Sequence, residues 1–351
     1  MFRASLRPYF RAFSLAALPL FLVACEDDAT GPADPLAEGE LTIDASSPVT
    51  FAYVSLETLS EVSISDAPSS TDWDLGFRRF GVKLNGGVAG PGSVEGANLL
   101  NSANRAAEEV LAFTRAYADS VWESVTADDI VGAPFQADGL VEAPGNAWFR
   151  FDPISGGLVA NSGAAWKIQT AEGGHGVMRV VEITAPGPLV SATLEVRYQA
   201  PGGTLAAPVQ IVGSTAMGPA FYDIETGSTV VPAGCNWDFS FDPGYAVTFN
   251  EACGAGTFPL DAAADFTAIS AADDEPEYAP FLSAIAGAFP SGFDGPEDVF
   301  WYNLEDNQIL WPTYNVFLVR KGTDVFKVQV LDYYDSSGTS GFPTVRFEQL
   351  Q

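Results

Sequence analysis

The sequence has 351 residues, and its 47% apolar and 12% aromatic content is enough to bury a core. Asp and Glu number 45 against 16 for Lys and Arg, which gives a formal net charge of −29. A surface of that charge repels phosphate, so nucleic acid is excluded as a partner. With one histidine and three cysteines, the chain cannot build Cys/His zinc sites and has almost no residues for an imidazole-based triad.

Residues 1–24 are typical of a secretory leader: three arginines precede a short apolar stretch that ends in Leu22-Val23-Ala24-Cys25. This pattern is a lipobox, and it predicts cleavage before Cys25 and attachment of a diacylglyceryl group to its thiol. The alternative is a leader that is cut elsewhere, with an incidental cysteine. The acidic, Pro-containing residues 25–46 then form a lipidated tether. We therefore expect a lipoprotein of the bacterial cell envelope, with the outer membrane as its expected location.

Beyond the tether, Gly and Pro are frequent, which favours short strands and many turns over long helices. Apolar residues alternate over 316–321 and 325–331, on either side of a turn at Gly322, and predict a hairpin with one buried face. One stretch, Ala103 to Val121, has helical periodicity. The sequence thus predicts a mainly β chain of antiparallel sheets with one or two short helices.

Cys235 and Cys253 are available to each other once the chain is exported to an oxidising compartment. A hairpin folded about Gly244 would place the two cysteines equidistant from its centre and opposite each other. We therefore predict a disulfide; two buried free thiols are the alternative.

The two halves of the chain contain the same short blocks in the same order. The matched blocks are 53–58 with 221–226, 73–77 with 237–241, 122–129 with 266–273, 148–149 with 301–302, 174–180 with 322–328, and 196–198 with 345–347. They predict a tandem duplication into domains 47–199 and 200–351. The alternative is that β-rich segments share aromatic and valine positions by composition alone.

Tryptophans recur at matched places in the two halves. Asp74 and Asp238 each follow one of them at the start of a strand and are expected to accept hydrogen bonds from backbone amides. Trp148 and Trp301 have two interpretations: anchors at sheet edges, or a flat wall on which a porphyrin or sugar ring stacks.

Three stretches resemble the HmuY family, lipid-anchored β-rich proteins whose best-known members bind haem. They are residues 41–46, residues 72–87 with their Asp72-Trp73-Asp74-Leu75 motif, and the C-terminal run from Trp301 to Tyr334. The resemblance implies an HmuY-like β fold for each of the two domains.

The resemblance also implies haem as cofactor, held by two axial His or Met side chains. By spacing from the matched tryptophans, one family ligand position falls on Pro153 and Asp306, which do not ligate haem iron. The residues with suitable chemistry are His175, Met178 and Met217. Strand alternation would put His175 and Met178 on opposite faces. The alternative is an exposed turn histidine with two gap-filling methionines.

Two functions follow from these patterns. The first is a membrane-anchored protein that binds haem or a related tetrapyrrole and serves an envelope receptor or transporter. The second is a non-haem module that binds a protein or glycan on the same fold, with the metal ligands lost. We expect no enzyme, because the sequence assembles no nucleophile, base and oxyanion site.

Overall fold

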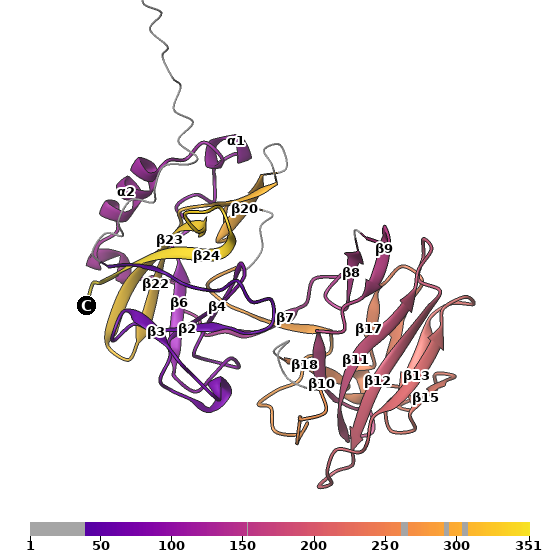
Figure 1. The fold of residues 1–351 in the computed structure, drawn as a ribbon. Coiled ribbons are helices and arrows are strands. Elements are labelled where there is room, and N and C mark those ends of the chain that lie inside the picture. The colour runs from indigo at the N-terminus through magenta and orange to yellow at the C-terminus, as the bar shows by residue number, and fades with distance from the viewer. Residues whose placement is uncertain (1–38, 153, 261–265, 291–294, 304–307) are drawn as a thin grey trace, which may run out of the picture. The chain divides into compact units, whose positions relative to one another are not determined.

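The computed structural model describes residues 39–152, 154–260, 266–290, 295–303 and 308–351 (Figure 1). Its strands pair antiparallel, and the prediction of a mainly β fold is confirmed. The leader and Cys25 lie outside the described residues. No helix among the described residues is long and apolar enough to cross a membrane.

Two sheets that share one core form the first sheet pair, which contains strands from both ends of the described chain. Its five-stranded sheet has the order β1-β24-β23-β22-β6, and its four-stranded sheet has the order β3-β2-β4-β5. Phe77, Val319 and Phe347, from both sheets, share one core. The strands are β1 (Glu40–Thr42), β2 (Ala52–Ser55), β3 (Ser60–Val62), β4 (Leu75–Arg78), β5 (Gly81–Leu84), β6 (Val94–Asn98), β22 (Val316–Lys321), β23 (Asp324–Tyr334) and β24 (Ser340–Gln349), with a separate hairpin of β20 (Phe300–Asn303) and β21 (Ile309–Pro312).

The second sheet pair is built from the middle of the chain in the same pattern. The orders are β13-β12-β11-β10-β18 and β15-β14-β16-β17, and Ile168, Leu194 and Phe239 share its core. The strands are β10 (Ala165–Gln169), β11 (His175–Thr184), β12 (Ser191–Gln199), β13 (Val209–Ser214), β14 (Ala220–Asp223), β15 (Ser228–Val230), β16 (Phe239–Phe241), β17 (Val247–Phe249) and β18 (Gly256–Leu260), with the hairpin β8 (Phe149–Asp152) and β9 (Gly157–Ala160) and the paired strands β7 (Gly139–Glu142) and β19 (Ser283–Ala286).

Helical structure covers one face of the first five-stranded sheet. The predicted helix 103–121 is instead a short α1 (Ala107–Val110) and α2 (Arg115–Ser124), separated because Thr114 is extended with ψ 171°. Val316 and Leu318 pack under the helical side with Val125, while their neighbours in β22 face the sheet core. This explains why β22 is buried on both faces. Short 3-10 helices, η1 (Ala67–Ser69), η2 (Ala127–Ile130) and η3 (Glu251–Cys253), complete the set.

The strand pairing does not follow the predicted domains 47–199 and 200–351. The expected boundary at Gln199 falls between β12 and β13, which pair in one sheet. Likewise β6 pairs with β22, and β10 pairs with β18, across the halves of the sequence. Each sheet pair therefore combines early strands of one half with late strands of the other. The described residues form a single compact unit.

The predicted disulfide is confirmed. Cys235 and Cys253 are bonded with a Cα–Cα distance of 5.6 Å. Between them, β16 and β17 form a hairpin in which Phe239 faces Phe249, so the register is centred on Gly244 as expected.

Replacing both cysteines by serine is expected to lower the free energy of unfolding by about 3 kcal/mol. The disulfide closes a loop with a sequence separation of 18, and the entropy that such a loop removes from the unfolded chain has this size. Urea unfolding of the oxidised protein and the variant measures the difference. Reducing the wild type should give the same loss, whereas an unchanged midpoint would show that the cross-link contributes nothing.

Candidate functional site

His175 is the first residue of β11 rather than an exposed hairpin tip. It pairs with Gln169 and Gln199 in the neighbouring strands, and its ring centroid lies 5.3 Å from that of Tyr278. Burial lowers the pKa of His175, although the nearby Asp273 charge opposes the shift. The imidazole is therefore mainly neutral at neutral pH.

The two methionines do not join this histidine. Met178 lies in the core of the second sheet pair and is 2% exposed. Val177, one residue before it, packs in a separate cluster with Phe266 on the other face, so His175 and Met178 point to opposite faces as alternation predicts. Met217 is fully exposed in the turn between β13 and β14. The structure thus brings none of the three candidate haem ligands together.

Tyr278, the aromatic neighbour of His175, is also unsuited to iron. Its hydroxyl donates a hydrogen bond to the Ala272 carbonyl oxygen. Burial, together with the Glu275 carboxylate, raises the pKa of the phenol well above its usual value. A ferric ligand would need the tyrosinate form, which this environment disfavours.

The two candidate stacking tryptophans differ. Trp148 is 1% exposed, and its ring centroid lies 4.5 Å from Phe241 and 4.8 Å from Phe149, so it is a core residue and not an open wall. Trp301 is partly buried in β20, opposite Trp311 in β21. The positions that spacing assigned to a family ligand, Pro153 and Asp306, lie outside the described residues.

The two Trp-Asp motifs confirm the expectation that their carboxylates accept backbone amides. Asp74 Oδ2 accepts from the Leu56 N–H at 2.7 Å. Asp238 accepts from Ile224 N–H at 2.8 Å and from Ala171 N–H at 2.7 Å. Both side chains are almost fully buried. In each sheet pair the carboxylate binds the backbone just after the neighbouring strand, at Leu56 after β2 and at Ile224 after β14, so its role is structural.

The charge around these two carboxylates is not the same. Lys321 Nζ lies 2.8 Å from Asp74 Oδ1. Around Asp238 the neighbouring charges are Asp223 and Glu225, and burial with these carboxylates raises the pKa of Asp238 to about 6. The surroundings of Asp238 are therefore more negatively charged than those of Asp74. Among the described residues, no group of three or more His, Cys, Asp or Glu side chains is arranged to hold a metal ion.

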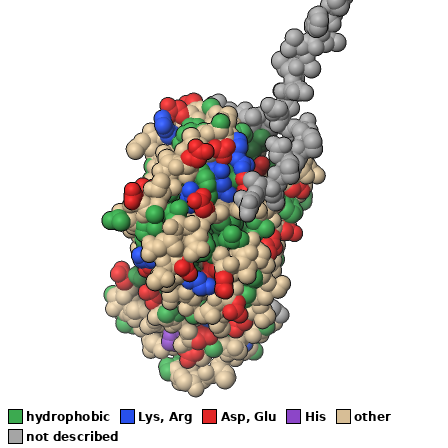
Figure 2. Space-filling view, turned by 90° about the vertical axis from the view of Figure 1, so that its left-hand side faces the viewer, with side chains coloured by type: hydrophobic (Ala, Val, Ile, Leu, Met, Phe, Trp, Pro, Cys, Tyr) green, Lys and Arg blue, Asp and Glu red, His purple; other side chains and the backbone are tan. Residues whose placement is uncertain are grey.

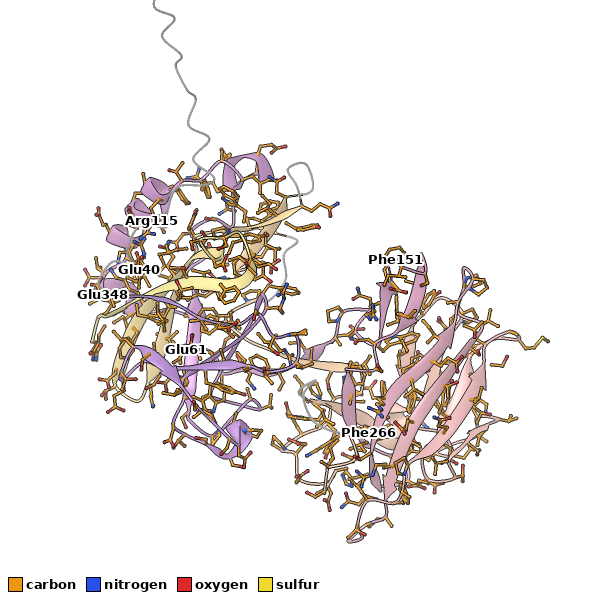
Figure 3. The ribbon with its side chains drawn as sticks, in the orientation of Figure 1. Glu40, Glu61, Arg115, Phe151, Phe266 and Glu348 are labelled. Carbon is orange, nitrogen blue, oxygen red and sulfur yellow. A yellow bond between two sulfur atoms is a disulfide. The ribbon has the colours of Figure 1, made fainter. Side chains whose placement is uncertain are left out.

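The surface cavities of the described residues include two of similar size. One, of about 420 Å³, is lined mostly by polar residues between Ser63 and Asp72. The other, of about 390 Å³, is lined by α2, β1 and β24, and includes Glu40, Arg115 and Glu348 (Figure 3).

Charges at the second cavity are already paired within the protein. Arg115 contacts Glu40 and Asp119, and Arg346 Nη1 lies 2.7 Å from Asp119 Oδ1. Arg346 also lies over the Trp122 ring, 4.5 Å from its centroid. These contacts tie α2 to the five-stranded sheet and leave little charge for a ligand. On the face drawn in Figure 2, acidic side chains are widely spread.

Antiparallel sheet pairs, a disulfide and buried structural carboxylates define a disulfide-bonded β protein. Within it, residues 49–183 match the model of the HmuY protein family, and this range contains the Asp72-Trp73-Asp74-Leu75 motif. The match runs from β2 to the end of β11 and so covers strands of both sheet pairs.

Two solved structures are similar to about half of the chain. One is a Bacteroides vulgatus protein described as HmuY-like and heme-binding, with 14% identity over 47% of this chain and 94% of its own and a TM-score of 0.15. The other, from Bacteroides fragilis, is described as a lipoprotein, with 14% identity over 47% of this chain and 91% of its own and a TM-score of 0.15. No curated protein matches the sequence.

Proposed function

We propose that this protein is a cell-envelope lipoprotein, anchored through Cys25, that uses HmuY-type sheets to bind a partner without axial haem ligation. The observation that carries the proposal is that the three candidate ligands lie apart. His175 lies at a partly buried strand end, Met178 in the core and Met217 in an exposed turn. We assign the protein no catalytic role.

Haem ligation by two axial side chains requires both to reach the iron from opposite sides of one ring. The mature chain has no other histidine or methionine, because the third methionine is Met1 of the leader. Met178 could reach a ligand only by leaving the core, which would leave a cavity. The residues present therefore do not fit a bis-axial haem.

Haem titration of the leaderless protein tests this proposal. We expect no Soret shift of the kind that two axial ligands produce, and the same spectra from His175→Ala and Met217→Ala. Met178→Leu tests the third candidate ligand, because it removes the thioether while keeping the core volume. A Soret shift that any of these substitutions abolishes would overturn the proposal.

A tetrapyrrole ligand is the second candidate, and the HmuY match of residues 49–183 favours it. His175 would then be the only axial ligand, with its neutral imidazole as the donor. In that case the titration would give a five-coordinate spectrum that His175→Ala removes. The two candidates therefore predict opposite results in one experiment.

A further inference from the structure

The outer faces of the two four-stranded sheets carry equivalent aromatic pairs. In the first sheet pair, the ring centroids of Tyr53 and Trp73 are 4.8 Å apart. In the second, Phe221 and Trp237 stand at 5.1 Å in the same places, on β14 and just before β16. The sheets have the same strand order, so the two faces can be compared residue by residue.

In the first sheet pair a lysine of the protein itself occupies the aromatic face. Lys83 Nζ lies 5.3 Å from the Trp73 centroid, 5.5 Å from Tyr53 and 4.2 Å from Phe51. Lys83 is opposite Gly76 in the β4–β5 register. An ammonium group at these distances is attracted by the negative faces of the rings.

The corresponding position in the second sheet pair has no cation. Thr248 is opposite Ser240 in the β16–β17 register, as Lys83 is opposite Gly76, and Thr248 is exposed. The aromatic pair Phe221–Trp237 therefore has a ring separation similar to that of the first pair, with an interplanar angle of 87° instead of 57°, and threonine replaces lysine at the matched register position.

The segment that leads to the tryptophan is also shorter in the second sheet pair. In the first sheet pair, the Trp73 indole N–H donates to the Ala67 carbonyl at 3.0 Å, and Trp73 is fully buried. The segment between Thr226 and Trp237 is four residues shorter than the one between Thr58 and Trp73. Phe221 and Trp237 are accordingly only partly buried.

We propose that the Phe221–Trp237 face binds a lysine or arginine side chain of a basic protein partner, which takes the place that Lys83 fills in the first sheet pair. Asp223 lies on the same face as Phe221, two residues along β14, and supplies a carboxylate near the incoming cation. The net charge of −29 favours the approach of a basic partner.

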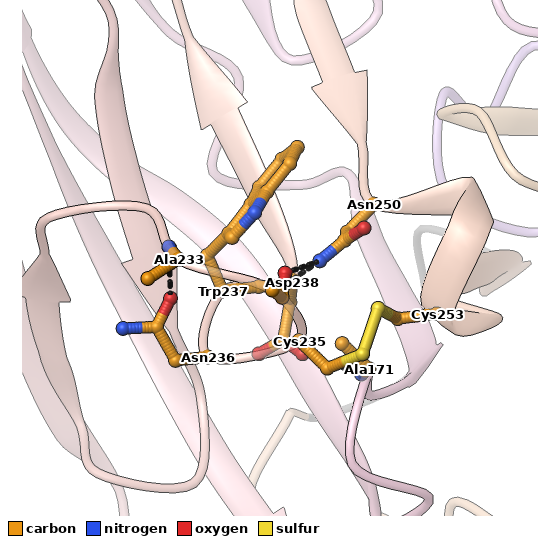
Figure 4. The surroundings of a disulfide bond; sticks show 9 residues. Ala171, Ala233, Cys235, Asn236, Trp237, Asp238, Asn250 and Cys253 are labelled. Carbon is orange, nitrogen blue, oxygen red and sulfur yellow. Dashed lines mark hydrogen bonds between the residues drawn. A yellow bond between two sulfur atoms is a disulfide. The ribbon is translucent and has the colours of Figure 1, made fainter.

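The disulfide helps to hold this face in place before binding. Cys235 lies two residues before Trp237 and is linked to Cys253 beyond the β16–β17 hairpin (Figure 4). A rigid platform loses less conformational freedom when it binds a ligand. This inference rests on the proposed function, since it names the partner chemistry of a non-haem binding module.

Indole N–H resonances of the leaderless protein test the proposal, with the resonance of Trp237 identified by its loss in Trp237→Leu. The probe is the peptide acetyl-Gly-Lys-Gly-amide, and its Gln analogue is the neutral control. We expect the Lys peptide alone to shift the Trp237 resonance, with a response that weakens as salt is added.

In Thr248→Lys, the new lysine should occupy the Phe221–Trp237 face as Lys83 occupies the first one, and the Lys peptide should then no longer shift the Trp237 resonance. Val212→Lys is the matched control: it adds the same charge at an exposed position on the other sheet, and it should leave the shift unchanged. An unmoved Trp237 resonance, or equal shifts with the Lys and Gln peptides, would overturn the proposal. Neither result bears on haem, so it is distinguishable from failure of the proposed function, which the Soret titration decides.

Discussion

A protease cut in the loop between β12 and β13 is expected to leave the two halves of the chain bound to each other. A cleavage site inserted among the exposed residues 201–204 would cut the chain into an N-terminal and a C-terminal fragment. Each fragment supplies strands to both sheet pairs: β6 needs β22, and β10 needs β18. Neither fragment can complete a five-stranded sheet without the other.

Size-exclusion chromatography of the cut protein measures this result. We expect one species at the elution volume of the uncut protein, which resolves into two fragments only in denaturant. The disulfide cannot account for retention, because Cys235 and Cys253 lie in the same fragment. Two separately eluting folded fragments would instead support the independent tandem domains 47–199 and 200–351.

Local features of this fold could be predicted from the sequence, but the exchange of strands between its halves could not. The hairpin of β22 and β23 follows from period-two alternation, and the disulfide follows from spacing about Gly244. Whether a given edge strand pairs with β22 or with β10 is a different question. Matched blocks have similar sequence patterns, so local pattern does not distinguish pairing within one half of the sequence from pairing between the halves.

The candidate site was predictable to a similar extent. Alternation correctly placed His175 and Met178 on opposite faces, and the Trp-Asp motifs correctly indicated amide acceptors. The burial of Trp148 was not evident, because a tryptophan in a β-rich sequence suits a core and a surface equally well. The Lys83 aromatic site is not part of the sequence-based prediction, although a lysine seven residues after Asp-Leu-Gly is a visible difference between the two matched blocks.

Asp138→Asn is expected to remove a pH dependence from the stability of the protein. Asp138 is 3% exposed and immediately precedes β7, and its Oδ2 accepts a hydrogen bond from the Leu84 N–H at 2.7 Å. Burial raises the pKa of this carboxyl to about 7, although the Leu84 hydrogen bond and the Lys83 charge oppose the shift. The folded state thus binds a proton that the unfolded state releases near pH 4, so stability falls as pH rises from about 4 through about 7.

A pKa difference of roughly three units corresponds to about 4 kcal/mol as an upper limit. Relative to wild type, Asp138→Asn should therefore gain stability between pH 4 and pH 8 by up to that amount, because asparagine keeps a carbonyl for the Leu84 amide and carries no charge to bury. Urea unfolding at both pH values measures the change, and Glu123→Gln on the exposed side of α2 is the control for loss of one carboxylate. If the free energy of unfolding of Asp138→Asn and that of wild type depended on pH in the same way, the expectation would be wrong, because the burial of Asp138 would then not destabilise the folded state at neutral pH.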